Sequence, residues 1–287
     1  MKASVVITTK NRKEELRVAL RSAFEQTAQP EVMVMDDGST DGTADMVRAE
    51  FPKALLQHFN ESKGYIVRRN EGAKLATGDV IFSIDDDAEF STARVIEQTL
   101  AEFDDPRIGA VAIPYIEPHK ANRLAQQAPD RTTVWVTDRF IGTAHAVRRD
   151  VFLKLGGYRE HLVHQGEEGD YCIRMLDAGY FVRLGNADPI HHFESPKRNL
   201  ERMDYYGCRN SILFAWQNVP TRHFLIHLSA TTFNCLRWTF VPKRFFTRLR
   251  GLFAGYRGGL GVQRTPVKPE TYRQWRKLGR ERTMPLE

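Results

Sequence analysis

The first half of the chain alternates short apolar runs with amphipathic stretches. Apolar, often β-branched runs of strand length occupy residues 4–9, 32–35, 55–59 and 79–84. Stretches with apolar residues at helical spacing lie between them, at residues 12–26, 40–50 and 64–76. This alternation predicts βαβ units, and therefore an α/β fold with a mostly parallel sheet flanked by helices.

The alternation continues less regularly to about residue 218. Further helices are predicted at residues 92–103, 148–155, 166–178 and 204–218. Further strands are predicted at residues 108–115, 134–142 and 181–184. Asn11 is a predicted N-cap, the polar residues 122–132 are predicted to form a loop, and the tail from Gly258 to Glu287 is expected to be flexible.

Polar side chains stand where the first, second and fourth predicted strands end. Thr8 and Thr9 end the first of these strands, Asp37 follows the second, and Asp85-Asp86-Asp87 ends the fourth. Ligands of open α/β sheets bind outside the carboxyl ends of the strands. Adjacent carboxylates repel each other unless a cation or hydrogen bonds offset the charge, and Mg²⁺ combines carboxylates with phosphate oxygens. The triplet predicts a metal–diphosphate site, and the alternative is a solvated acidic turn.

Composition narrows the class of protein. The chain has 287 residues, of which 41% are hydrophobic and 27% charged, values typical of globular domains. No apolar run reaches the roughly 20 residues of a membrane helix, and no signal peptide is expected. Three widely spaced cysteines without a CxxC pair indicate a reduced, cytoplasmic protein without structural zinc. The sequence lacks both GxGxxG after the first strand and GxxxxGK[ST], which argues against classical dinucleotide and P-loop sites.

In their order along the chain, several motifs resemble those of family 2 glycosyltransferases. The motifs occupy residues 5–12, 36–41, 69–72, 78–87, 156–158, 166–174 and 192–195. The resemblance covers about residues 4–210. It implies a Rossmann-like GT-A fold and the transfer of one sugar, with inversion, from a nucleotide-diphosphate sugar.

The resemblance also implies roles for residues on the donor side. Thr8 and Asp37 match residues that hold the nucleotide base, and Thr9 stands beside Thr8 at the same strand end. Arg69 matches a basic residue near the donor, and Asp85 matches an acid that faces the ribose or the sugar. Lys10 departs from the aromatic residue that many relatives carry near the base, so the base stays open.

The metal ligands follow from the same resemblance. Asp87 matches the metal ligand of the family's DxD motif, and Asp86 occupies its variable middle position on the donor side. His192 matches a histidine that can complete a site for Mn²⁺ or Mg²⁺, with His191 as the alternative. A further alternative is that both histidines belong to a surface loop.

An acidic cluster matches the family's acceptor-site motif. An inverting transfer needs a carboxylate that takes the proton of the acceptor hydroxyl. Glu168 occupies the position of this base, where most relatives carry Asp, and Glu167 and Asp170 are its rivals. The structural alternative is that acids in the first turn stabilise a helix by about 0.3–1 kcal/mol each.

The last third of the chain differs in character. We divide the chain into a catalytic domain at residues 1–200, with a nucleotide-sugar half at about 1–90 and an acceptor half at about 91–200, and a helical extension at 201–287. The extension is aromatic, with Phe233, Trp238 and Phe240 among its residues, and has no acid between Lys243 and Arg257. It is expected to lie on an anionic membrane, to cover the domain, or to pair with a second subunit as a homodimer. No nucleic-acid recognition module is visible.

We therefore interpret the chain as a metal-dependent glycosyltransferase of cell-surface polysaccharide or lipid-linked glycan assembly. The acceptor is expected to be a glycan or a lipid-linked glycan. The chain lacks the QxxRW motif and membrane helices of processive relatives, so one sugar per encounter is expected. One alternative is a sugar nucleotidyltransferase, although the Gly-rich basic first loop of such enzymes is missing. Another is a non-catalytic protein that binds nucleotide sugars at the membrane surface.

Overall fold

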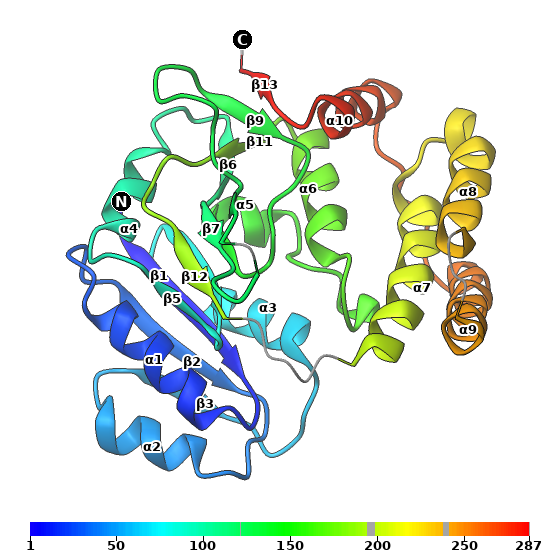
Figure 1. The fold of residues 1–287 in the computed structure, drawn as a ribbon. Coiled ribbons are helices and arrows are strands. Elements are labelled where there is room, and N and C mark those ends of the chain that lie inside the picture. Colours follow the sequence, from blue (N-terminus) through cyan, green and yellow to red (C-terminus); the bar gives the residue numbers. More distant parts are fainter. Residues whose placement is uncertain (121, 194–198, 238–240, 287) are drawn as a thin grey trace.

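In the computed structural model, which describes residues 1–120, 122–193, 199–237 and 241–286, a nine-stranded sheet forms the centre of the molecule. The order of its strands is β13-β9-β11-β6-β10-β4-β1-β2-β3. These strands are β1 (Ala3–Thr9), β2 (Glu31–Asp36), β3 (Leu55–His58), β4 (Val80–Asp85), β6 (Ile108–Ala112), β9 (Trp135–Thr137), β10 (Ala144–Arg148), β11 (Phe181–Leu184) and β13 (Met284–Pro285). The helices that flank the sheet are α1 (Lys13–Phe24), α2 (Thr43–Glu50), α3 (Tyr65–Leu75), α4 (Val95–Ala101), α5 (Arg149–Lys154) and α6 (Glu167–Asp177). Helices therefore cover a central sheet, as the α/β prediction states (Figure 1).

The first half of the sheet is parallel, because β4, β1, β2 and β3 are joined through α1, α2 and α3. Both faces of β1, β2 and β4 are buried, whereas β3 at the edge of the sheet is partly exposed. Val5 and Ile7 pack with Leu16 of α1 on one side, while Val6 packs with Ile66 of α3 on the other. The strands therefore show continuous apolar runs, and their carboxyl ends lie side by side at one edge.

The second half of the sheet is mixed, because β10 runs antiparallel to both β4 and β6. The prediction missed β10. Its residues Ala144, His145 and Ala146 have little intrinsic strand preference, but all three are buried between two neighbouring strands. Tertiary packing therefore decides the structure of this segment.

A second, four-stranded sheet within the described residues lies beside the end of β4. It contains β5 (Ala88–Phe90), β7 (Tyr115–Ile116), β8 (Leu124–Ala125) and β12 (Ile190–His192), in the order β5-β12-β7-β8. β12 pairs antiparallel with β5, so that His192 is opposite Ala88, and the Phe193 N–H donates to the Asp87 carbonyl over 2.9 Å. This pairing brings His192 beside the aspartate triplet although more than a hundred residues separate them.

The C-terminal part consists of α7 (Leu200–Asn218), α8 (Thr221–Leu236), α9 (Pro242–Leu260) and α10 (Pro269–Glu281), followed by β13. Figure 1 shows α8 and α9 on the side of α7 that faces away from the sheet. A flexible tail beyond Gly258 was a wrong prediction. α10 buries Tyr272 and Leu278, and β13 pairs with β9 at the edge of the central sheet.

Two smaller predictions were also wrong. Asn11 does not cap α1, because Arg12 holds the N-cap position and the Asn11 Oδ1 accepts from the Thr40 N–H over 2.7 Å. The polar stretch at 122–132, predicted to be a loop, includes strand β8. The predicted features at Glu194, Ser195, Trp238 and Phe240 lie outside the described residues. Over the described part of the chain, no helix has both the length and the apolar character needed to cross a bilayer.

Candidate active site

The carboxyl ends of β1, β2 and β4 open onto a cavity of about 670 Å³. We call it the first cavity. Most of the residues that the sequence singles out lie in its wall. They are Thr8, Thr9, Asp37, Arg69, Asp85, Asp86, Asp87, Glu168 and His192. The fold thus brings segments from both ends of the catalytic half to one place.

The three aspartates point to different partners. Asp85 Oδ1 accepts from Arg69 Nη2 over 2.6 Å. Asp86 accepts from Thr9 Oγ1 over 2.8 Å and from Arg12 Nη1 over 3.0 Å, and Asp87 Oδ2 accepts from the same Arg12 nitrogen over 2.7 Å. Burial raises the pKa of Asp86 to about 7, so this middle acid is less readily ionised than Asp87.

Asp85, Asp87 and His192 can hold a metal ion together. Each offers one ligand atom, and these atoms lie within 4.8 Å of one another. His192 Nε2 lies 3.3 Å from Asp87 Oδ1 and 3.9 Å from Asp85 Oδ2. Two carboxylates and one imidazole, beside space for water and phosphate, are a donor set that fits Mn²⁺ or Mg²⁺.

The contact between Asp87 and His192 favours a negatively charged Asp87 and a positively charged His192. Burial opposes ionisation of Asp87, but the hydrogen bond with His192 and the charge of Arg12 outweigh it and hold the Asp87 pKa well below its usual range. Burial also opposes protonation of His192, yet Asp87 and Asp85 raise the His192 pKa above its ordinary value. A cation at this position would therefore meet an ionised Asp87 carboxylate, and it would displace the proton of His192 on binding.

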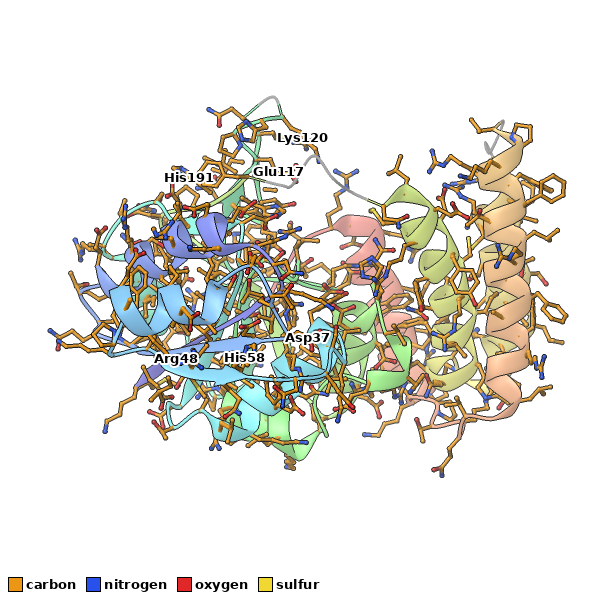
Figure 2. The ribbon with its side chains drawn as sticks, turned by 90° about the horizontal axis from the view of Figure 1, so that it is seen from below. Asp37, Arg48, His58, Glu117, Lys120 and His191 are labelled. Atoms are coloured by element: carbon orange, nitrogen blue, oxygen red, sulfur yellow. The ribbon has the colours of Figure 1, made fainter. Side chains whose placement is uncertain are left out.

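His191 lies apart from this group, on the other face of β12. Its Nδ1 is 3.2 Å from Glu89 Oε1. Figure 2 shows His191 on the part of the molecule away from Asp37. Of the two histidines, His192 is the one in the wall of the first cavity.

Asp37 is held by the segment that enters α3. Its carboxylate accepts from Ser62 Oγ (2.5 Å), Lys63 N (2.8 Å), Gly64 N (2.9 Å) and Arg68 Nε (2.7 Å). Burial raises the Asp37 pKa, but these hydrogen bonds outweigh it and lower the pKa overall. Asp37 therefore fixes the loop at this side of the cavity in addition to lining it.

Arg69 connects the donor edge with the acidic start of α6. It is buried, and it donates from Nη2 to Asp85 (2.6 Å) and from Nη1 to Glu167 Oε1 (3.4 Å). Its guanidinium lies 4.9 Å from the ring centroid of Tyr65. The Arg69 guanidinium thus contacts the carboxyl groups of Asp85 and Glu167, which are more than eighty residues apart in the sequence.

The three acids at the start of α6 have different surroundings. Asp170 is buried and is held by Arg159 (2.6 Å) and Arg174 (3.1 Å). Glu167 is fully buried, and burial and the neighbouring Glu168 charge raise its pKa. Glu168 is only half-buried and lines the first cavity; burial raises its pKa as well.

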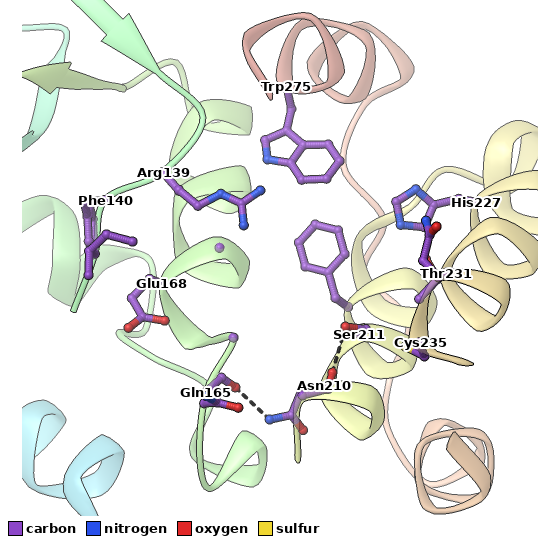
Figure 3. Close-up of a pocket in the computed structure, with 16 residues that line it drawn as sticks. Arg139, Phe140, Gln165, Glu168, Asn210, Ser211, His227, Thr231, Cys235 and Trp275 are labelled. Atoms are coloured by element: carbon purple, nitrogen blue, oxygen red, sulfur yellow. Dashed lines mark hydrogen bonds between the residues drawn. The ribbon is translucent and has the colours of Figure 1, made fainter. Parts of the chain in front are cut away.

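Glu168 also lines a second cavity of about 580 Å³ between α6 and the C-terminal helices. The side chains around this second cavity are mainly aromatic or polar, and they include Arg139, Phe140, Asn210, Phe214, His227 and Trp275. Figure 3 shows Glu168 on one side of this space and Trp275 and His227 on the other. The Glu168 carboxylate therefore stands where the two cavities meet.

Several lining residues were missed by the sequence analysis. Arg12, which forms ion pairs with Asp86 and Asp87, lies in the first motif and at a predicted helix start, but the sequence assigns it no role in the site. Asn199 and Arg202 of the α7 entrance line the first cavity, and Trp275 of α10 lines the second. The sequence could have indicated Arg12, because it is a basic residue at the start of the helix that follows β1. No motif marks Asn199, Arg202 or Trp275.

Comparison with known proteins identifies relatives. The family model described as Glycosyl transferase family 2 matches residues 4–156. The O-antigen chain rhamnosyltransferase WbaN of Salmonella anatum is 25% identical over 272 residues, covering 86% of this chain and 85% of WbaN. The uncharacterized glycosyltransferase YwdF of Bacillus subtilis (strain 168) is 35% identical over 243 residues, covering 79% of this chain and 90% of YwdF.

The fold has solved counterparts. The mannosyltransferase PcManGT from Pyrobaculum calidifontis, solved in complex with GDP-Man and Mn²⁺, superposes with a TM-score of 0.63 at 19% identity. The match covers 96% of this chain and 79% of that protein. At this identity the similarity establishes the GT-A fold, which confirms the predicted fold class.

Proposed function

The chain belongs to glycosyltransferase family 2, and we propose that it moves one sugar from a nucleotide-diphosphate sugar to an acceptor hydroxyl with inversion of the anomeric centre. One observation carries this proposal. Glu168 stands between a cavity built from strand-end acids and a second, aromatic cavity. A base between a donor site and an acceptor site is what a direct displacement requires.

On the donor side, the nucleotide would lie over the ends of β1 and β2, near Thr8, Thr9 and Asp37, with Arg69 close to the donor. Asp85, Asp87 and His192 would hold Mn²⁺ or Mg²⁺, which when bound stabilises negative charge on the leaving nucleoside diphosphate. Arg12 fixes one oxygen of Asp87, and the other oxygen then faces His192. Arg12 thus orients the carboxylate toward the ligand position.

On the acceptor side, the hydroxyl would enter from the second cavity. Its oxygen attacks the anomeric carbon opposite the departing diphosphate, and its proton passes to the Glu168 carboxylate. The rivals are less suitable, since Asp170 is occupied by two arginines and Glu167 is buried against Arg69. The geometry therefore favours Glu168 as the general base.

For the pathway, we propose assembly of a cell-surface polysaccharide or a lipid-linked glycan in the cytoplasm. The similarity to the O-antigen chain rhamnosyltransferase WbaN over most of both chains supports this class of acceptor. Cys172, Cys208 and Cys235 are all free, which suits a reducing compartment. We also keep the division into a catalytic domain at 1–200 and an extension at 201–287 as a proposal.

Calorimetry with UDP, dTDP and GDP tests the donor site, with each nucleotide titrated in Mn²⁺ and in chelator. We expect one nucleotide to bind more tightly with Mn²⁺, and Asp87→Ala to abolish this difference. Glu89→Ala is the matched control, because this nearby acid pairs with His191 outside the proposed metal site. If no nucleotide responds to the metal, the donor-site proposal is wrong.

A screen of nucleotide sugars for slow hydrolysis tests the transfer itself. Release of the nucleoside diphosphate from one donor supports an enzyme and names the sugar. Tight, metal-dependent binding without any turnover, with or without glycan acceptors, would instead support a non-catalytic nucleotide-sugar binding protein.

A further inference from the structure

The outer sides of α8 and α9 expose an unusual amount of apolar surface. Eight of the seventeen strongly exposed large apolar side chains among the described residues lie on these two helices. They are Leu225, Ile226 and Phe233 on α8, and Phe246, Leu249, Phe253, Tyr256 and Leu260 on α9. On each helix their spacing places them on one side. We call these eight residues the apolar face; soluble monomers rarely leave so large an apolar area uncovered.

The opposite side of α9 is fixed to α7. Gly251, Gly255 and Gly259 recur every fourth residue and let the two helices approach closely. A Cβ at Gly255 would lie only 2.7 Å from the Arg209 carbonyl oxygen of α7. Since α9 packs on α7 through its glycines, the exposed apolar residues on its opposite side point away from α7. Figure 1 shows α7 between α9 and the sheet.

The two helices present one continuous surface. Phe233 of α8 and Tyr256 of α9 line the same groove, and the Tyr256 hydroxyl lies 2.6 Å from Thr232 Oγ1. A partner that contacts one helix would therefore contact both.

The charge around the apolar face indicates the kind of partner. Residues 205–269 contain ten Lys and Arg residues and no Asp or Glu. Lys243, Arg250 and Arg257 recur every seventh residue beside the apolar stripe of α9, and Arg222 and Arg237 stand at the two ends of α8. Within the described part of the chain, no carboxylate pairs with Arg250 or Arg257. A second copy of this face would bring like charges together, whereas anionic lipid headgroups complement them.

We propose that the apolar face docks on an anionic lipid bilayer, with its aromatic and aliphatic side chains in the headgroup region and the arginines on lipid phosphates. This geometry is that of helices that lie in the membrane interface without crossing it. The surface itself does not depend on the proposed glycosyl transfer.

One consequence does rest on the proposed function. The inner side of α8 contributes His227, Thr231 and Asn234 to the second cavity. Only the thickness of one helix, about 10 Å, then separates this cavity from the lipid surface. An acceptor glycan carried on a membrane lipid is therefore the substrate class that fits the docked enzyme.

Vesicle flotation of the full chain tests the docking. We expect binding to phosphatidylcholine vesicles that contain phosphatidylglycerol and little binding to phosphatidylcholine alone. Phe246→Ser combined with Phe253→Ser should weaken binding by at least about tenfold, because two aromatic anchors are lost. Arg250→Gln combined with Arg257→Gln should weaken it by about fivefold for each arginine.

The matched control is Leu55→Ser combined with Leu75→Ser. These residues of β3 and α3 are 50% and 54% exposed, compared with 61% and 69% for Phe246 and Phe253. The proposal is overturned if the control variant with Leu55→Ser and Leu75→Ser loses as much vesicle binding as the variant with Phe246→Ser and Phe253→Ser. It is also overturned if the unaltered chain does not bind anionic vesicles. Light scattering that shows a lipid-free dimer dissociated by the Phe246→Ser and Phe253→Ser changes would overturn it as well, since a second copy would then be the partner. Nucleotide calorimetry on the same variants reports separately on the donor site.

Discussion

At the residue scale, neighbouring acids have different surroundings. Glu167 and Glu168 are adjacent, yet one is fully buried against Arg69 and the other faces both cavities. Burial and the neighbouring Glu168 charge raise the pKa of Glu167, which favours its neutral form and leaves Glu168 as the charged member of the pair.

This assignment predicts opposite outcomes for two amide substitutions. Glu168→Gln should lower turnover by roughly 10²–10⁴-fold with donor affinity unchanged, because the general base is lost. Glu167→Gln should keep turnover within a few-fold, because a neutral amide replaces a carboxyl group whose raised pKa already favours the neutral form. Steady-state rates and nucleotide calorimetry measure both quantities. A large loss in Glu167→Gln and a small one in Glu168→Gln would move the base to Glu167.

A second residue-scale prediction concerns Glu102, at the C-cap of α4. Its Oε1 accepts from the Asn186 N–H over 2.5 Å, while its buried Oε2 has no partner among the described residues. Burial raises the Glu102 pKa from 4.5 to about 7. Between these values the unfolded chain has released the proton that the folded chain still holds. Stability from this group is therefore lost as pH rises from about 4.5 to about 7.

Glu102→Gln should remove this pH dependence. The free energy of unfolding of the variant minus that of the unaltered chain should be roughly 1–3 kcal/mol larger at pH 8 than at pH 5. Urea denaturation at the two pH values measures the difference. The same difference between the two proteins at both pH values would mean that the burial of Glu102 has no electrostatic cost.

At the element scale, the sequence predicted a strand correctly where the residues of the run are themselves apolar enough to be buried on both faces of the sheet. The runs around Val5 and Phe82 are mostly apolar, and the strands they predict are present. By contrast, α10 has a strongly charged sequence with few apolar residues, of which Tyr272 and Leu278 supply the buried contacts, so the sequence offers little sign that this segment packs on the domain. For β10, only its position between β4 and β6 makes the strand.

The candidate site divides in the same way. Residues at strand ends were predictable, because chain order alone places Thr8, Asp37 and Asp85 at one edge of a parallel sheet. Arg12 and Trp275 were not, because their positions depend on side-chain direction and on the docking of a distant helix. Such information is absent from local spacing.

The glycine stripe of α9 gives an element-scale prediction. Gly255→Ala should lower the free energy of unfolding by about 1–3 kcal/mol, because the new methyl group meets the backbone of α7. Gly258→Ala is the control in the same helix, since its Cβ would meet only Leu213 Cδ2 at 3.6 Å. That control should leave stability unchanged or raise it by up to about 1 kcal/mol. Thermal or chemical unfolding measures both variants. Equal changes in their free energy of unfolding would contradict the close packing of Gly255 on α7.

At the scale of the whole molecule, the C-terminal extension and the catalytic half share structure. One apolar cluster joins Ile173 of α6 with Ala215 and Val219 of α7 and with Val267 and Tyr272 around α10. The strand β13 continues the central sheet through β9. The two parts on either side of the proposed boundary near residue 200 therefore share packing, and we expect them to unfold together.

A chain that ends at Gly261 tests this expectation. It lacks α10 and β13 but keeps the donor residues and the apolar face. It loses the buried side chains of Val267, Tyr272 and Leu278, each worth about 1.5–3 kcal/mol. With about 2–4 °C for each kcal/mol in a domain of this size, the Tm should fall by roughly 10–35 °C.

Turnover should fall with stability in this truncated chain, because α6 carries Glu168 and is tied to the lost segment. The Thr271 hydroxyl donates to Asp177 Oδ1 at the end of α6 over 2.7 Å, and the Lys268 N–H donates to the same oxygen over 2.9 Å. Nucleotide binding at β1, β2 and β4 should persist below the new Tm. Lys277→Ala, on the exposed side of α10, should leave Tm and turnover unchanged. Two separate transitions in the full chain, or an unchanged Tm after truncation, would mean that the extension folds independently of the catalytic half.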